Sequence, residues 1–199
     1  MPQIDYFLAT LSPNVYMAGL QLEEVAAKHG ATVRYRPLDV MALFGRTGGT
    51  PPKDRHPSRQ EYRLIEMRRK AKLNALDINL KPAFWPSNGA PSAYAIIAAQ
   101  NAGGGDVGKL VFALTRACWA EEKNIAEDDV ISACLAEAGF DPTLAAGMMV
   151  AEAEEYSANL EEAVNRGVFG LPFYIAGEDE RFWGEDRIEH LDLHLSGKL

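Results

Sequence analysis

Short strand patterns at both ends of the chain frame a longer helical middle. A run of β-forming residues over 3–9 stops just before Ser12 and Pro13 and predicts a buried strand. Ser12 as a cap and Pro13 as the first helical residue predict a helix over 14–29. Alternating residues over 32–36 predict a second strand. Because a helix separates the two strands, we expect them to be parallel.

The middle of the chain has helical patterns that follow a long loop. Residues 37–57 contain several glycines and prolines, which predict a long loop. Loops of this length are typically functional or disordered. Helices are then predicted over 58–74, from about Pro91 onward, and over 107–121, 127–138 and 141–165. Toward the C-terminus, the pattern predicts a strand within 167–175, a partner strand over 181–183 and a final helix over 186–195.

The order of these elements is β-α-β, then several helices, then β-β-α. Two strand pairs from opposite ends of the chain can join in one four-stranded sheet, with the helices between them as an insertion. The sequence therefore predicts an α/β protein with a thioredoxin-like fold and an inserted all-helical domain. The expected thioredoxin-like domain is discontinuous, over 1–40 and 166–199, and a connecting loop, 41–57, leads to the helical domain, 58–165.

Composition narrows the functional classes. The chain has 199 residues and a formal net charge of −8, which argues against nucleic acid as the main partner, because phosphate contacts need a surplus of lysine and arginine. Its two cysteines, Cys118 and Cys134, lie among apolar helical residues and are expected to be packed thiols. Without a long apolar run or a basic leader, the chain is expected to be cytoplasmic and to have no membrane partner.

Two motifs have both a functional and a structural interpretation, and the structural one is preferred. Gly103–Gly108 has the G-x-G-x-x-G spacing of dinucleotide sites, but helical residues precede it where such a site requires a strand. We therefore expect a turn between two helices there. His190 and His194 can share a helix face, but no third ligand accompanies them, so no metal site is expected.

Three further positions lie where elements meet, and each has two interpretations. Ser12 can simply cap its helix, or it can donate a hydrogen bond to a thiolate or oxyanion placed at that helix start. Leu171 and Pro172 open a strand, and a cis bond between them would turn the backbone of Leu171 toward a cleft. Asp186 can be an N-cap, or it can present its carboxylate to a ligand ammonium group.

Three segments, taken together, resemble the 2-hydroxychromene-2-carboxylate isomerase family, which is related to kappa-class glutathione transferases within the DsbA-like thioredoxin-fold group. They are the first strand with Ser12-Pro13-Asn-Val-Tyr16; Tyr35-Arg-Pro37 with Leu43-Phe44-Gly-Arg-Thr47-Gly48 and Pro51-Pro52; and Gly167-Val-Phe-Gly-Leu171-Pro172-Phe with Phe182-Trp183-Gly184-Glu-Asp186-Arg187. The resemblance covers nearly the whole chain, in the same order.

The resemblance implies a homodimeric enzyme with glutathione as its cofactor and a small aromatic molecule as its substrate. It implies that Ser12 is the catalytic serine that holds the glutathione sulfur. Pro172 matches the family's cis-proline, and Leu171 would pair with the cysteinyl backbone of glutathione. The other cofactor-binding residues that it implies are Trp183, Glu185 and Asp186, with Asp186 near the γ-glutamyl end. The substrate pocket that it implies contains Pro13, Asn14, Tyr16, Trp85 and Asn88.

The chain departs from the family pattern at two positions near this site. Gly45 stands where many relatives have lysine, so Arg46 or Lys53 is expected to supply the positive charge for cofactor binding. Asn14 stands where relatives often have an aromatic residue. Both changes bear on how a ligand carboxylate and an aromatic substrate would be recognised.

The implied reaction is the cis–trans isomerisation of a conjugated, aromatic-derived acid by reversible thiolate addition. Its type is the conversion of 2-hydroxychromene-2-carboxylate to trans-o-hydroxybenzylidenepyruvate. A kappa-class-like glutathione transferase acting on small electrophiles is the main alternative, and a non-catalytic protein that binds glutathione or a partner is another. A thiol–disulfide oxidoreductase is disfavoured, because Ser12 and Val15 occupy the positions that a redox pair of cysteines would need.

Overall fold

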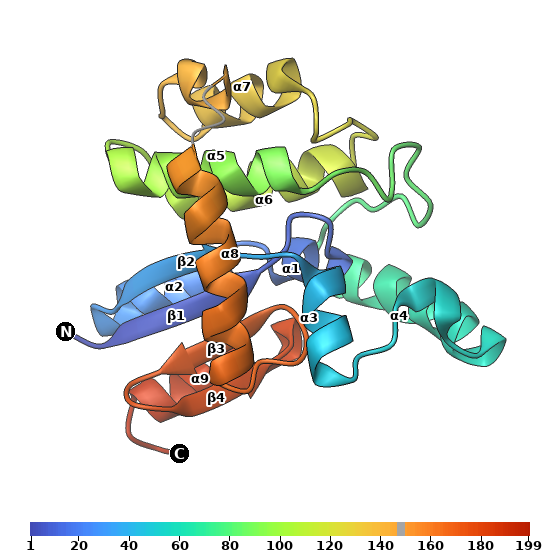
Figure 1. Ribbon diagram of the computed structural model, residues 1–199. Coiled ribbons are helices and arrows are strands. Elements are labelled where there is room, and N and C mark those ends of the chain that lie inside the picture. The colour runs from blue at the N-terminus through green and yellow to red at the C-terminus, as the bar shows by residue number, and fades with distance from the viewer. Residues whose placement is uncertain (147–149) are drawn as a thin grey trace.

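A four-stranded mixed sheet built from the two ends of the chain forms the base of the protein. The computed structural model describes residues 1–146 and 150–199 (Figure 1). The strands are β1 (Gln3–Leu8), β2 (Thr32–Pro37), β3 (Phe173–Ala176) and β4 (Glu180–Trp183), in the order β2-β1-β3-β4. β1 and β2 are parallel, whereas β3 is antiparallel to both β1 and β4. The predicted strand pairs and their union in one sheet are confirmed.

The helical segment that follows β1 is interrupted, whereas the sequence pattern predicted one continuous helix. The predicted continuous helix over 14–29 is wrong, because α1 (Pro13–Ala18) and α2 (Gln21–His29) are separate. Gly19 lies between them with φ of 57°, a backbone conformation that favours glycine and that ends a helix. The short α1 therefore ends after six residues. Ser12 thus lies at the start of a helix that is distinct from α2.

A helix also replaces part of the predicted connecting loop. α3 (Val40–Thr47) lies within residues 37–57, so the prediction of a structureless loop there is wrong. The Asp39 carboxylate caps α3 by accepting hydrogen bonds from the N–H groups of Met41 at 2.8 Å and Ala42 at 3.1 Å. Gly48 ends the helix in the left-handed conformation, with φ of 78°. Both signals are present in the sequence.

The remaining helices follow the predicted pattern closely. They are α4 (Pro57–Leu73), α5 (Ala90–Ala102), α6 (Val107–Trp119), α7 (Asp128–Glu137), α8 (Val150–Asn165) and α9 (Ile188–Leu195), with 3-10 turns η1 (Pro52–Asp54), η2 (Pro142–Ala146) and η3 (Glu185–Arg187). The predicted helix over 141–165 is thus divided into η2 and α8, and its residues 147–149 lie outside the described part of the chain. None of the helices described is long and apolar enough to cross a membrane.

Apolar side chains on the two faces of the sheet pack into different clusters. Ile4, Tyr6 and Leu8 of β1 join a large cluster with buried residues of α1, α2, α5 and α6. Phe7, between them in the sequence, points to the opposite face and joins a smaller cluster with residues of α3 and α8. Figure 1 shows α5, α6 and α7 stacked beyond the sheet, with α8 running from that layer across β2 and β1.

Candidate active site

Ser12 lies in the turn between β1 and α1, half-buried at the start of that helix. Its backbone N–H donates to the carbonyl of Ala9 at 3.0 Å, which holds the turn. Its Oγ atom accepts a long hydrogen bond, 3.4 Å, from the N–H of Val15. The hydroxyl proton has no acceptor among the described residues. Ser12 therefore caps α1 weakly and keeps its own proton free for a ligand.

Leu171 and Pro172 precede β3, and the peptide bond between them is cis. Both residues are buried, and Leu171 faces the same cleft as Ser12. Among the described residues, neither the N–H nor the C=O group of Leu171, which lies outside the helices and strands, forms a hydrogen bond to another backbone group. An N–H donor and a C=O acceptor are therefore available at the edge of this cleft. The residue pattern left the isomer of this bond open, and the cis form that the family resemblance implies for Pro172 is the one present.

The Ser12 cleft has a volume of about 150 Å³ and walls from six separate segments. The residues that line it are contributed by the Ser12 turn, by α3 and the η1 region, by α4, by the 85–86 segment and by the turn before β3. Of the predicted site residues, the cleft brings together Ser12, Pro13, Asn14, Trp85 and Leu171. Most of its surface is apolar, and its polar groups are few.

Trp85 is fixed against the Ser12 turn. Its indole Nε1–H donates to the carbonyl of Leu11 at 3.0 Å, and its ring lies 5.4 Å from that of Trp119, centroid to centroid. The Trp85–Pro86 peptide bond is cis, and both residues line the cleft. The indole is therefore held in place as one wall of the cleft by a hydrogen bond and by its contact with Trp119.

Other predicted residues lie outside the Ser12 cleft. Tyr16 is buried, stacks on Phe112 and donates from its hydroxyl to the carbonyl of Asp77 at 2.6 Å. Burial and the nearby Asp77 raise its pKa. Arg46 is exposed on α3 and pairs with Glu161 of α8 at 2.7 Å. Neither side chain reaches the cleft.

The residues that follow β3 are divided between the surface and the core. Trp183 of β4 is 54% exposed and packs edge-on against Phe169, with ring centroids 4.8 Å apart. Asp186 is exposed in η3 and caps no helix, so the N-cap interpretation of this residue is wrong. Its carboxylate lies 3.1 Å from Arg187. The Asp186 carboxylate is thus exposed at the surface, where Arg187 is its ion-pair partner.

Glu185, next to Asp186, is buried and forms an ion pair with Lys70 of α4. Only 5% of the Glu185 side chain and 29% of the Lys70 side chain are exposed. Burial alone would lower the pKa of Lys70, but the hydrogen bond to Glu185 and the negative charges of Glu185, Asp186 and Glu66 together outweigh that effect and raise the pKa. The Lys70–Glu185 ion pair connects α4 to η3, the 3-10 turn that also contains Asp186. The structure does not bring Glu185 to the cleft.

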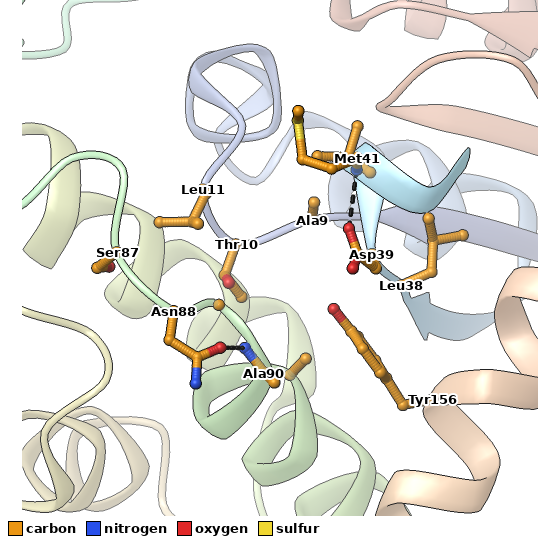
Figure 2. Close-up of a pocket in the computed structure, with 13 residues that line it drawn as sticks. Ala9, Thr10, Leu11, Leu38, Asp39, Met41, Ser87, Asn88, Ala90 and Tyr156 are labelled. Atoms are coloured by element: carbon orange, nitrogen blue, oxygen red, sulfur yellow. Dashed lines mark hydrogen bonds between the residues drawn. The ribbon is translucent and has the colours of Figure 1, made fainter. Parts of the chain in front are cut away.

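Asn88 lines a second cavity of about 260 Å³ next to the Ser12 cleft (Figure 2). The two cavities share Leu11, Val40 and Met41 in their walls, so they are neighbours on either side of the same residues. Figure 2 shows the Tyr156 side chain of α8 pointing toward Asp39 from across this second cavity. Its lining is mixed, with hydroxyl, amide and carboxylate groups as well as apolar side chains.

Arg55 and Arg63 line the Ser12 cleft, and the sequence reading missed both. Lys53, which was expected to supply positive charge, is exposed and does not line it. A signal for Arg63 exists in the sequence. It lies four residues before Met67 and eight before Ala71, the two buried residues of α4, so all three share the inward face of that helix.

Metal-binding and redox groups are not part of this cleft. Among the described residues, no group of three or more histidine, cysteine or acidic side chains is placed to hold a metal ion. Cys118 and Cys134 are buried away from the Ser12 cleft and do not pair with each other. Burial raises the pKa of Cys118 to about 12, and burial with nearby Glu137 raises that of Cys134 to about 11.

Residues 3–196 match the family model of the DSBA-like thioredoxin domain. A 2-hydroxychromene-2-carboxylate isomerase from Pseudomonas putida is 27% identical over 201 residues, which cover 98% of this chain and 95% of the relative. Glutathione S-transferase kappa 1 from Caenorhabditis elegans is 24% identical over 215 residues, with 98% and 91% covered.

Two solved structures share the fold along almost the whole chain. A 2-hydroxychromene-2-carboxylate isomerase aligns with a TM-score of 0.80 and 23% identity, over 98% of this chain and 95% of that one. The cytosolic disulfide reductase DsbM from Pseudomonas aeruginosa, solved with GSH, aligns with a TM-score of 0.69 and 19% identity, over 98% and 99%.

Proposed function

The chain belongs to the DSBA-like thioredoxin domain family, and from this premise we propose that it is a glutathione-dependent cis–trans isomerase. The observation that carries the proposal is the meeting of Ser12, the free backbone of Leu171 and the Trp85 wall in one apolar cleft. The names of relatives covering nearly the full chain support isomerase chemistry. The substrate type we propose is 2-hydroxychromene-2-carboxylate, converted to trans-o-hydroxybenzylidenepyruvate.

The residues present fit glutathione. Ser12 offers a hydroxyl proton, and Leu171 offers one backbone donor and one acceptor, the complement of an extended peptide. Asp186 offers an exposed carboxylate for the γ-glutamyl ammonium group. Bound glutathione would supply a thiolate that adds reversibly to a conjugated double bond, so that rotation occurs about a single bond. A homodimer and a cytoplasmic location stay predictions.

Each protein group has a definite task in this reaction. The Ser12 hydroxyl would donate a hydrogen bond to the sulfur of bound glutathione, which would favour the thiolate over the thiol and lower the thiol pKa. Backbone pairing at Leu171 would hold the cysteinyl part of glutathione, which would reduce the entropy cost of the addition step. The Trp85 face, held by Leu11, gives the substrate a flat apolar surface and keeps water away from the reacting atoms.

A kappa-class-like glutathione transferase is the second candidate. The similarity to the Caenorhabditis elegans transferase favours it, because this relative covers almost the same length as the isomerases. Both reactions would use the same thiolate at Ser12, and they differ in whether the thiolate leaves again. A thiol–disulfide oxidoreductase is not supported, because no cysteine stands at Ser12 or Val15 and the two cysteines of the chain are buried elsewhere.

The test is the change in ultraviolet absorbance of 2-hydroxychromene-2-carboxylate with and without glutathione. We expect glutathione-dependent conversion, and a fall in kcat of about 100-fold in Ser12→Ala, the typical cost of removing one donor to a developing or bound anion. Ser58→Ala, at an exposed serine of α4, is the matched control and should keep full activity. Conversion at the same rate without glutathione would refute the proposal, and stable thioether formation with 1-chloro-2,4-dinitrobenzene alone would favour the transferase.

A further inference from the structure

Two arginines enter the Ser12 cleft without an acidic partner. Arg55 and Arg63 both line the cleft, and neither takes part in any ion pair formed by the described residues. Both side chains are half-buried rather than free in solvent. Arg55 donates from Nε to the carbonyl of Thr50 at 2.9 Å, which holds the side chain but leaves its charge uncompensated.

Arg63 is held by aromatic rings instead of a carboxylate. Its guanidinium carbon lies 5.3 Å from the centre of the Trp85 ring and 6.0 Å from that of Trp119. These cation–π contacts place the positive charge over the two indole rings and use none of the N–H donors of the guanidinium. Arg63 forms no hydrogen bond to another side chain or backbone group in the part of the chain that the structure describes. Its donors therefore remain for a ligand.

The two charges also repel each other. Burial lowers the pKa of Arg63, and the neighbouring charge of Arg55 adds to that effect. Burial lowers the pKa of Arg55 as well, together with the charge of Arg59. Both groups stay protonated at neutral pH, since the ordinary arginine pKa is above 12. Like charges desolvated in one cleft raise the free energy of the empty site, and a bound anion relieves that cost.

We propose that Arg55 and Arg63 form a binding site for the carboxylate of a planar aromatic acid, with the Trp85 indole beside it to take the ring. The inference rests on the proposed function, because it names what the same cleft recognises in its substrate. A guanidinium edge next to an aromatic face matches an acid group conjugated to a ring, whereas a neutral electrophile would use the apolar wall alone. The pair thus selects acids over neutral substrates in the cleft that contains Ser12.

Glutathione also has carboxylates, and the experiment must distinguish that source. The groups proposed for glutathione, Leu171 and Asp186, belong to the turn before β3 and to η3, whereas Arg63 belongs to α4 and stacks on Trp85. We therefore assign the arginine pair to the substrate. In the isomerase assay, Arg55→Gln and Arg63→Gln should raise the KM for 2-hydroxychromene-2-carboxylate about 10- to 100-fold, the effect of losing a hydrogen bond to a charged group.

The KM for glutathione should stay within about twofold of wild type in both variants, and Arg63→Lys should recover only part of the loss, because lysine lacks the planar fork. Arg68→Gln is the matched control, since Arg68 is exposed on the same helix and forms no ion pair among the described residues. A rise in the glutathione KM with an unchanged substrate KM would overturn the assignment to the substrate. Thermal unfolding of each variant separates lost binding from lost folding.

A second measurement does not depend on turnover. By titration calorimetry at low salt, wild-type protein should bind trans-cinnamate at least about tenfold more tightly than trans-cinnamamide, and both glutamine variants should lose that preference. Equal affinity for acid and amide in the wild-type protein, or a preference that survives in both variants, would overturn the inference. If the preference follows this pattern but no glutathione-dependent conversion occurs, the proposed reaction fails and the carboxylate site stands.

Discussion

Replacing Lys70 with methionine should destabilise the protein strongly through the buried carboxylate that it leaves behind. The Lys70→Met variant keeps most of the side-chain volume but removes the only ion-pair partner that Glu185 has among the described residues. Because just 5% of the Glu185 side chain is exposed, water cannot replace the lost ammonium group without opening η3. Breaking a buried pair in this way costs about 3–5 kcal/mol.

That loss is large compared with the free energy of unfolding of a typical native protein, which is about 5–15 kcal/mol. For a chain of this size it corresponds to a fall in Tm of roughly 6–20 °C, at about 2–4 °C per kcal/mol. The Lys70→Met/Glu185→Leu double variant has no buried charge left, so its free energy of unfolding should return to within about 2 kcal/mol of wild type or exceed it. Urea unfolding, followed by tryptophan fluorescence, measures the free energy of unfolding of all three proteins.

The pH dependence has a definite sign. The folded-state pKa of Lys70 is raised by its hydrogen bond to Glu185, so the stability contributed by its charge is fully present below the ordinary lysine pKa of about 10.4. It is lost as pH rises through the folded-state value. The gap between wild type and Lys70→Met should therefore be constant from about pH 7 to 9 and should narrow only above pH 10.

The exposed pair Lys28–Asp192 provides the matched control. Its side chains are 61% and 27% exposed, so Lys28→Met should cost less than about 1 kcal/mol. The reasoning is refuted if Lys70→Met costs no more than this control, or if the double variant is as unstable as the single one. Either result would mean that Glu185 reaches water or another donor when Lys70 is absent.

Two further variants test other parts of the site's support. The Asp5 carboxylate accepts hydrogen bonds from Arg36 and Arg166, each at 2.7 Å. Burial raises the pKa of Asp5, but these two hydrogen bonds and the charges of the arginines hold it below its ordinary value. Asp5→Asn should therefore lower the free energy of unfolding by about 3–5 kcal/mol, measured by urea unfolding at pH 7. This cost should shrink as pH falls below about 4 through the folded-state pKa, and a cost unchanged at pH 2 would contradict it. Gly170→Ala would place a Cβ atom 2.5 Å from the indole nitrogen of Trp183, so it should displace that ring and shift its fluorescence emission, whereas an unchanged spectrum would show that the turn gives way instead.

The sequence predicted the strands well because each has a local signature that tertiary packing reinforces. β1 alternates between the two sheet faces, with Ile4 and Tyr6 on one side and Phe7 on the other, as the period of two requires. The start of α1 was likewise readable from Ser12 and Pro13. The end of α1 was not readable, because a single residue with positive φ, Gly19, interrupts an otherwise continuous helical pattern.

The candidate site shows a different limit. Ser12 and Leu171 were found from motifs at the ends of strands, and the structure places them in one cleft. Arg63 was missed because a charged residue on a polar helix normally indicates a solvated face, and only the buried positions of Met67 and Ala71 show that this face turns inward. Arg46 pairs with Glu161, which is more than 100 residues away in the sequence. No local pattern could have revealed that contact.

The sheet has a consequence for the order in which the chain can fold during its synthesis. β1 (Gln3–Leu8) lies in the centre of the sheet, between β2 and β3, but β3 (Phe173–Ala176) is made about 170 residues later. At about 5–20 residues per second, the first strand waits roughly 10–30 s for its antiparallel neighbour. Throughout that interval one edge of β1 is unpaired, although β2 and the local helices are already available. The thioredoxin-like core, and the Leu171 side of the cleft with it, can therefore form only after nearly the whole chain has been synthesised.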